Sequence, residues 1–264
     1  MNWNHKIYLP ESESRVARLK EVVQGRSIGI LAAGPSISEL EFKIVELRDT
    51  NICWFGMNTF SQENHILSRI NKEYELYIDA CRENIPETIQ DIFKFLKRKE
   101  PNMFISTYYR NAFGLLTNGF DCVTPYLLKP YSQKLLFFYL ASTHDVPSQE
   151  NPLHFIEGNS LQMAIQIGII SGSPRIVLFG ADGGADSSAR YYRQEDYLGS
   201  FVPSSQKLLQ DTLHFNPTMP ISIRNICNAY GIPIPQILNV SMSSLYTPFE
   251  KVSYDTAFRF LRGR

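Results

Sequence analysis

The chain has 264 residues, of which 44% are hydrophobic, and its 26 basic side chains are balanced by 26 acidic ones. This length is enough for one α/β domain with a sizeable core, and the composition excludes a disordered chain. Because the charges balance, no overall field favours nucleic acid or a membrane surface, and no nucleic-acid partner is expected.

The cysteines and the N-terminal segment narrow the setting. The four cysteines are scattered and form no C-x-x-C pair, so neither a zinc site nor a disulfide framework is expected. The first residues lack the apolar segment of a signal peptide, and no uninterrupted apolar run reaches the length of a membrane span. The expected location is the cytoplasm.

The first predicted elements are a short helix within residues 1–26 and a strand that ends in a tight turn. The apolar residues of this strand are Ile28, Ile30, Leu31 and Ala33. Such a run is typical of a strand buried on both faces of a parallel sheet. Gly34 has no Cβ and lets backbone approach a ligand closely. Pro35 suits the first turn of a helix, and the Ser36 hydroxyl beside free helix N–H groups forms a natural seat for phosphate.

Strands and helices then alternate. Strands are predicted over residues 51–57, 75–79 and 103–106, and helices over residues 37–47, 60–70 and 85–96. The helix over 37–47 is identified from Ile37, Leu40, Ile44, Val45 and Leu47. Asn58 falls at the carboxyl end of the strand over 51–57, the edge at which open α/β sheets bind ligands.

Residues 108–155 interrupt this alternation. The segment contains Asn118-Gly119, several prolines and many aromatic residues, without a clear β-α rhythm. We interpret it as an inserted cap or lid, with a plain surface loop as the alternative. The cap would separate residues 1–107 and 156–264, the two parts of one nucleotide-binding domain.

The alternation returns at Gly158-Asn159-Ser160, which opens a helix that stops at Gly172. Further strands are expected over 175–179 and 234–240, a polar loop over 186–205, and a helix over 220–230. Strands that alternate with helices predict an α/β fold, a Rossmann-like, doubly wound and mostly parallel sheet.

Several polar residues fall at predicted strand ends or at a helix start. They are Gly34, Pro35, Ser36, Asn58, Asn159, Ser160, Gly180 and Asp182. These loops converge in a doubly wound sheet, so a nucleotide or nucleotide-sugar site is predicted there. The P-loop and G-x-G-x-x-G patterns are absent, which argues against P-loop kinase chemistry and a standard dinucleotide site. Asp182 could hold a divalent ion, bind a ribose hydroxyl or cap its own turn.

Two histidines are candidates for ligand contact or proton transfer. His154 precedes the Gly158-Asn159-Ser160 helix start, and His214 lies before the predicted helix over 220–230. A flexible loop could bring His214 over the site. A lone histidine is more often a surface or capping residue than a base, so both readings stay open.

These motifs resemble the core of the bacterial sialyltransferases that modify lipooligosaccharide. They also resemble a wider group that includes flagellin glycosylation motility accessory factors and 6-hydroxymethylpterin diphosphokinase-like proteins. The resemblance rests on Gly34-Pro35-Ser36, Asn58, Ser160, Gly180-Ala181-Asp182 and Ser243-Ser244-Leu245. It covers residues 27–79 and 156–250 and does not include the cap.

The resemblance implies an inverting glycosyltransferase that uses a nucleotide sugar, a CMP-linked nonulosonate above all, and a glycan or protein acceptor. His214 would be the general base, and Tyr191 and Tyr192 would hydrogen-bond the departing phosphate. Ser243 would join the nucleotide site, and neither a metal nor a cofactor is expected. The alternatives are a diphosphokinase-like enzyme that needs ATP and a divalent metal, and a non-catalytic nucleotide-binding module. Peripheral membrane attachment and a homo-oligomer are left open.

Overall fold

The computed structural model describes residues 12–57, 65–80, 103–109, 135–141, 153–154, 160–184 and 205–263. The strands are β1 (Ile28–Leu31), β2 (Cys53–Met57), β3 (Leu76–Ala80), β4 (Met103–Tyr109), β5 (Leu135–Ala141), β6 (Leu153–His154), β7 (Arg175–Phe179), β8 (Gln236–Asn239) and β9 (Glu250–Lys251). The α-helices are α1 (Ser12–Val23), α2 (Ser38–Lys43), α5 (Ser160–Ile170), α6 (Ser205–Tyr230) and α7 (Tyr254–Leu261). Short 3₁₀ helices are η2 (Pro35–Ile37), η3 (Ile44–Leu47) and η5 (Leu67–Ile70).

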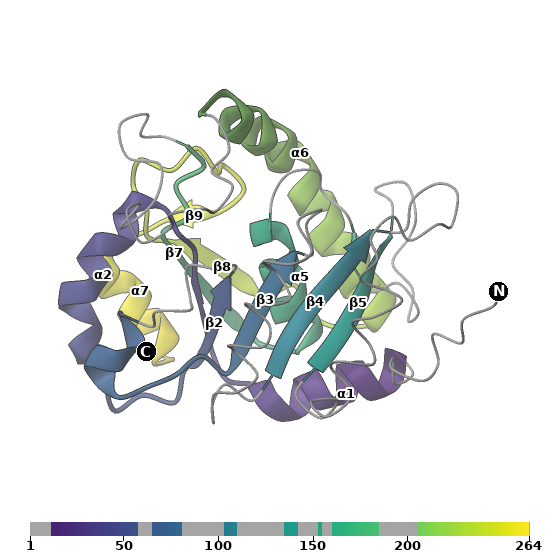
Figure 1. Ribbon diagram of the computed structural model, residues 1–264, viewed down its shortest axis with the longest axis horizontal. Coiled ribbons are helices and arrows are strands. Elements are labelled where there is room, and N and C mark those ends of the chain that lie inside the picture. The colour runs from purple at the N-terminus through teal and green to yellow at the C-terminus, as the bar shows by residue number, and fades with distance from the viewer. Residues whose placement is uncertain are drawn as a thin grey trace, which may run out of the picture.

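The described strands form a nine-stranded sheet in the order β6-β5-β4-β3-β2-β1-β7-β8-β9 (Figure 1). Each pairing between them is parallel. From β1 the chain adds strands outward to β6 and then returns to place β7 on the other side of β1. Ile28 therefore pairs with Cys53 on one side and with Ile176 on the other. The predicted doubly wound α/β fold is confirmed, and its topological switch lies between β1 and β7.

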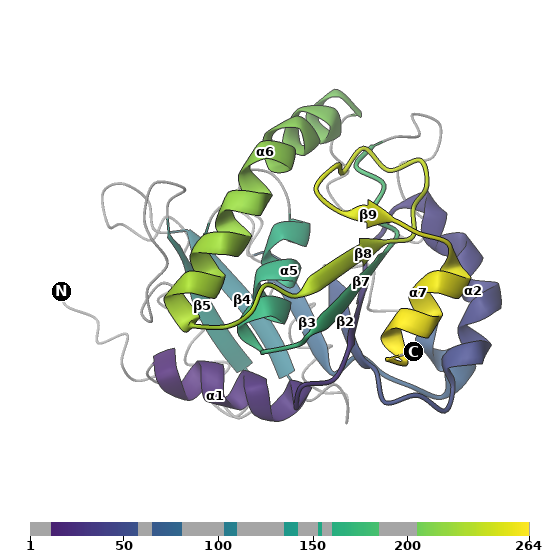
Figure 2. The same ribbon diagram turned by 180° about the vertical axis from the view of Figure 1, so that it is seen from behind.

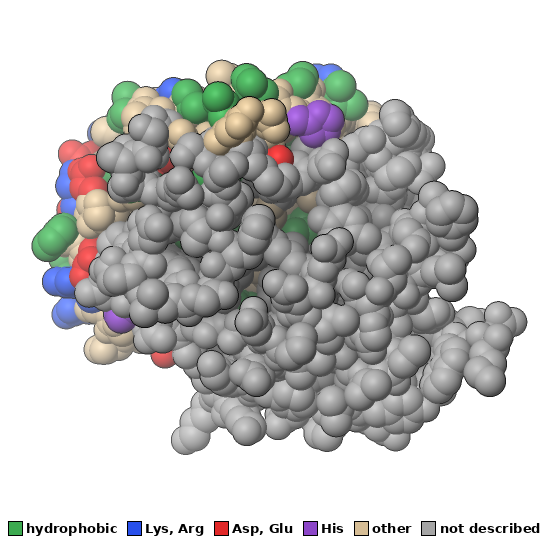
Figure 3. Space-filling view, turned by 45° about the horizontal axis from the view of Figure 1, so that its top comes forward, with side chains coloured by type: hydrophobic (Ala, Val, Ile, Leu, Met, Phe, Trp, Pro, Cys, Tyr) green, Lys and Arg blue, Asp and Glu red, His purple; other side chains and the backbone are tan. Residues whose placement is uncertain are grey.

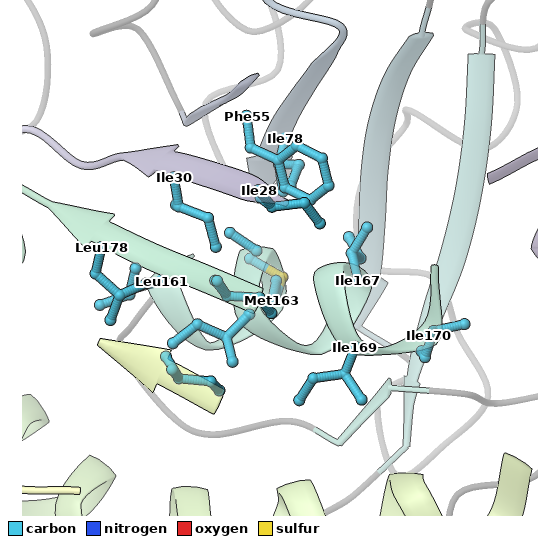
Figure 4. Packing of buried hydrophobic residues seen from close by; sticks show 14 of the residues in the cluster. Ile28, Ile30, Phe55, Ile78, Leu161, Met163, Ile167, Ile169, Ile170 and Leu178 are labelled. Carbon is cyan, nitrogen blue, oxygen red and sulfur yellow. The ribbon is translucent and has the colours of Figure 1, made fainter. Parts of the chain in front are cut away.

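Helices cover both faces of the sheet because alternate residues of each central strand point to opposite sides. On one face, Ile28 and Ile30 of β1 join a core that includes residues of α1, α5 and α6. On the other face, Leu31 joins a core with α2, η3, η5 and α7. Figure 4 shows the first core, in which Ile28 and Ile30 face the side chains of α5. Each fully buried aliphatic side chain contributes about 1.5–3 kcal/mol.

Helix α5 is buried along its whole length, which explains its nearly unbroken apolar sequence. A Cβ on Gly168 would lie 3.0 Å from Ile176 Cδ1 and 3.4 Å from Ile28 Cδ1, so a glycine here lets the helix pack closely on β1 and β7. The helix begins at Ser160, as predicted, and Gly172 beyond its end has φ +81°. None of the described helices is both long and apolar enough to span a bilayer.

The other face departs from the single helix predicted over 37–47. Here η2, α2 and η3 follow one another, and Val45, which was predicted to share the apolar face, is 46% exposed. Leu40, Ile44 and Leu47 are fully buried, as expected. Both views show α7 beside α2 (Figures 1 and 2). The predicted N-terminal helix and the predicted strand over 175–179 are confirmed, and α7 follows near the C-terminal end of the chain.

The predicted cap over 108–155 is wrong in two stretches. Residues 135–141 form β5, which pairs in parallel with β4, and residues 153–154 form β6 at the edge of the sheet. The run Leu135–Ala141 is almost wholly apolar, as expected of an inner strand of a parallel sheet. Except for the end of β4, the rest of the predicted cap lies outside the described residues, and its role stays a prediction.

The helix predicted over 220–230 begins much earlier, at Ser205, and contains Pro217 and Pro220 in its interior. An internal proline costs a helix about 3 kcal/mol. The sequence therefore predicts a helix only from residue 220 onward. Burial of the inner face outweighs this cost, since Phe215, Met219 and Ile226 are fully buried. His214 is therefore part of a helix, and the flexible loop predicted to carry it is wrong.

Candidate functional site

The turns that follow β1 and β7 are bonded directly to each other at the topological switch. The Ala32 N–H donates to Phe179 O at 2.8 Å, and the Gly34 N–H donates to Gly180 O at 2.9 Å. Gly34 has φ −72°, which any residue can adopt, so its backbone conformation does not require glycine. A Cβ at this position would overlap Asp182 Oδ2 and Gly180 O and would lie 2.9 Å from Asp182 Cγ. The space predicted for a ligand at Gly34 is thus occupied by the chain's own β7 turn.

Asp182 joins the loops that follow β1, β7 and β8. Its side chain is buried, and Oδ2 accepts a hydrogen bond from the Ser36 N–H at 3.0 Å while Oδ1 accepts one from Ser241 Oγ. The Asp182 carbonyl accepts the Leu245 N–H at 3.0 Å. Neither of these side-chain bonds is to the turn of Asp182 itself, so the predicted capping of its own turn is not what they show: the carboxylate links this turn to the loops after β1 and β8.

The last residue of β8 and the residues after it complete this network, and most of them are not among the predicted site residues. Asn239 is fully buried and donates from Nδ2 to Ala181 O and to Ser244 Oγ, each at 3.1 Å. Its Oδ1 accepts the Ser241 N–H at 3.0 Å. The signal that could have found Asn239 is the one used for Asn58, a polar residue at the carboxyl end of an apolar run. Ser243, which is predicted to join the nucleotide site, is exposed.

Helix α6 holds the same loops from above the sheet edge. Thr212 Oγ1 donates to Gly183 O at 3.0 Å, and Asn216 Nδ2 donates to Leu245 O at 2.9 Å. Thr212 and Asn216 are one helical turn apart and therefore lie on the same face. Figures 1 and 2 show the N-terminal half of α6 projecting past the edge where the central strands end.

His214 lies on the opposite side of α6 from these contacts. It is two residues from both Thr212 and Asn216, which turns it about 200° around the helix from each. Its side chain is exposed, and its neighbour Leu213 is 62% exposed. Figure 3 shows hydrophobic side chains along the upper margin of the molecule. The structure does not bring His214 to Asp182.

One polar atom of Ser36 lies outside this hydrogen-bond network. Its Oγ is buried and has no hydrogen-bond partner, whereas its carbonyl accepts the Tyr254 hydroxyl at 3.0 Å. Burial, followed by the charges of Glu39 and Asp182, raises the pKa of Tyr254, so this hydroxyl remains a proton donor. Tyr254 also lies 6.0 Å from the Phe179 ring, between centroids, which ties α7 to the Ser36 turn.

The remaining predicted residues divide into two groups. Pro35 lies in the first turn of η2, Gly180 has φ +69° at the end of β7, and Ser160 is buried at the start of α5. Asn58, Asn159, Tyr191 and Tyr192 lie outside the described residues, so their roles stay predictions. Within the described residues, no cluster of three His, Cys, Asp or Glu side chains could hold a metal ion.

Comparison of the chain with protein-family models, with curated proteins and with solved structures finds no match. The resemblance to the sialyltransferase core therefore rests on the short motifs alone.

Proposed function

We propose that the chain is a sialyltransferase-like glycosyltransferase that binds a nucleotide sugar, CMP-linked by resemblance, at the sheet edge between β1 and β7. The observation that carries this proposal is the topological switch, where the loops after β1, β7 and β8 meet beneath the N-terminal half of α6. Ligands of open α/β sheets bind outside the carboxyl ends of strands at such a switch. The resemblance supports sugar transfer to a glycan or protein acceptor.

Thermal shift measurements test the nucleotide. A ligand that binds only the folded chain raises its unfolding midpoint, so CMP and CDP should raise it more than ATP, UDP or GDP do. Ser36→Ala is the informative variant because it removes a hydroxyl that has no partner in the structure. Ser38→Ala, two residues further and exposed, is its control. Equal shifts with ATP and CMP, or no shift with any nucleotide, would contradict the proposal.

The general base remains a prediction. Removal of an acceptor proton near neutral pH suits histidine, and a positioned base contributes about 10²- to 10⁴-fold to the rate. His214→Ala should lower kcat by that factor if His214 is the base, although its outward position on α6 argues against this role. His154 lies on β6, and β5, β4, β3 and β2 separate it from β1. Assaying His214→Ala beside His154→Ala decides whether either residue is the base.

A non-catalytic nucleotide-binding module is the second candidate. It is favoured by the engagement of both Asp182 carboxylate oxygens within the chain and by the outward position of His214. Release of CMP from a CMP-linked sugar separates the two functions, since a binding module would take the donor without turnover. If a chelator abolished turnover and added metal restored it, this would instead indicate the diphosphokinase-like enzyme, whose chemistry needs Mg²⁺ to bridge phosphates.

A further inference from the structure

The backbone after β1 has no N–H group left for a phosphate between Gly34 and Ser38. The Gly34 N–H donates to Gly180 O, the Ser36 N–H to Asp182 Oδ2, and the Ile37 N–H to Gly34 O at 3.1 Å. Pro35 has no N–H, and the Ser38 N–H donates to Pro35 O. Phosphate binding at a turn of this kind depends on free N–H groups. Here the chain itself satisfies all of them.

The charge at this turn also opposes a phosphate. The Asp182 carboxylate is buried, and its described partners are an uncharged amide and an uncharged hydroxyl. Residues 32–37, 180–184 and 239–246 include no lysine or arginine. Lys251 reaches these loops only at Met242, where Nζ donates to the carbonyl at 3.4 Å. A phosphate beside Ser36 would meet a like charge at close range in a partly buried place, where Coulomb repulsion is stronger than in bulk water.

We propose that Asp182 keeps phosphate away from the turn after β1, so that the uncharged ribose of the bound nucleotide lies against Ser36. The buried and unpartnered Ser36 Oγ can either donate to or accept from such a hydroxyl. The surrounding Ala33, Gly34 and Pro35 are half-buried and carry no charge. This inference rests on the proposed function and specifies which part of the nucleotide sugar lies at the turn after β1.

Calorimetric titration of cytidine and CMP into the wild type and two variants tests the inference. Asp182→Asn removes the charge but keeps both contacts, since the amide oxygen can accept the Ser36 N–H and the amide nitrogen can donate to Ser241 Oγ. This variant should bind CMP about tenfold more tightly, as expected for removal of one charge several ångströms away. Its affinity for cytidine should not change. Ser36→Ala should weaken cytidine and CMP by the same factor.

Two results overturn the inference while the proposed function stands. One is an Asp182→Asn variant that binds CMP no better than the wild type does. The other is a Ser36→Ala variant that loses affinity for CMP but not for cytidine, which would place the phosphate at Ser36. If Asp182→Asn fails to unfold cooperatively in urea, the Ser36→Ala comparison alone decides. If neither cytidine nor any nucleotide binds the wild type, the proposed function fails, and the inference fails with it.

Discussion

Replacing Gly34 by alanine tests the packing on which the site is built. The new Cβ would overlap Asp182 Oδ2 and Gly180 O, and the backbone φ of −72° adds no strain of its own. Overpacking of this kind costs about 1–3 kcal/mol. Movement of the turns would also weaken the Gly34 N–H to Gly180 O bond and the charge-assisted Ser36 N–H to Asp182 bond, about 1 and 1.5–3 kcal/mol. Because the two bonds are weakened rather than lost, the expected loss is about 3–5 kcal/mol.

Such a loss is a large part of the roughly 5–15 kcal/mol that holds a typical domain folded. Urea denaturation measures it, provided that the dependence of the unfolding free energy on urea is unchanged. Gly172→Ala is the matched control because Gly172 has φ +81° but nothing lies within 4 Å of an added Cβ. That variant should lose only about 1–2 kcal/mol of stability, because an alanine at this φ is strained. If Gly34→Ala costs no more than Gly172→Ala, the packing of Asp182 against the β1 turn is wrong.

Three further predictions concern the residues around this site. Asn239→Ala should cost about 2–3 kcal/mol in urea denaturation, because it leaves the buried Ser241 N–H unpaired; a loss under about 0.5 kcal/mol would contradict the network. Burial raises the pKa of Tyr254, so above pH about 10 the unfolded tyrosine loses its proton while the folded one keeps it, and stability falls as pH rises. Tyr254→Phe should reduce this fall in stability. A smaller fall should remain from about pH 8.5, and Cys53 contributes to it because burial also raises the pKa of its thiol. An unchanged profile would exclude Tyr254 as the source of the fall. Thr212→Val should cost about 1 kcal/mol and speed amide hydrogen exchange in the N-terminal half of α6, whereas unchanged exchange would show that Thr212 does not anchor the helix.

The sheet could be predicted from the sequence to the extent that its strands are continuous apolar runs. The strand predicted over 175–179 coincides with β7, since its last four residues are all apolar and fully buried. The run Leu135–Ala141 carries the same signal. The prolines and aromatic residues around this run obscure its signal, because they are typical of an irregular segment.

The candidate site could be predicted only in part, because its decisive contacts join distant residues. Ser36 and Asp182 follow predicted strands, and they do lie together at one edge of the sheet. No local pattern shows that they bond to each other, or that Gly34 serves Asp182 rather than a ligand. The position of His214 within a helix could not be predicted, because Pro217 and Pro220 are typical of a helix boundary. The buried face that overrides them is visible only once α6 packs on the sheet.

The position of β1 at the centre of the sheet has a consequence for synthesis of the chain. Ser36 and Asp182 are 146 residues apart, and β1 pairs with β7 over a similarly long interval. Until β7 leaves the ribosome, a nascent chain can pair β1 only with β2 and presents its other side as an open, apolar edge. Such edges are prone to association with other chains, and contacts between distant residues form slowly. Co-translational folding of this protein therefore depends on protection of β1 until β7 has been made.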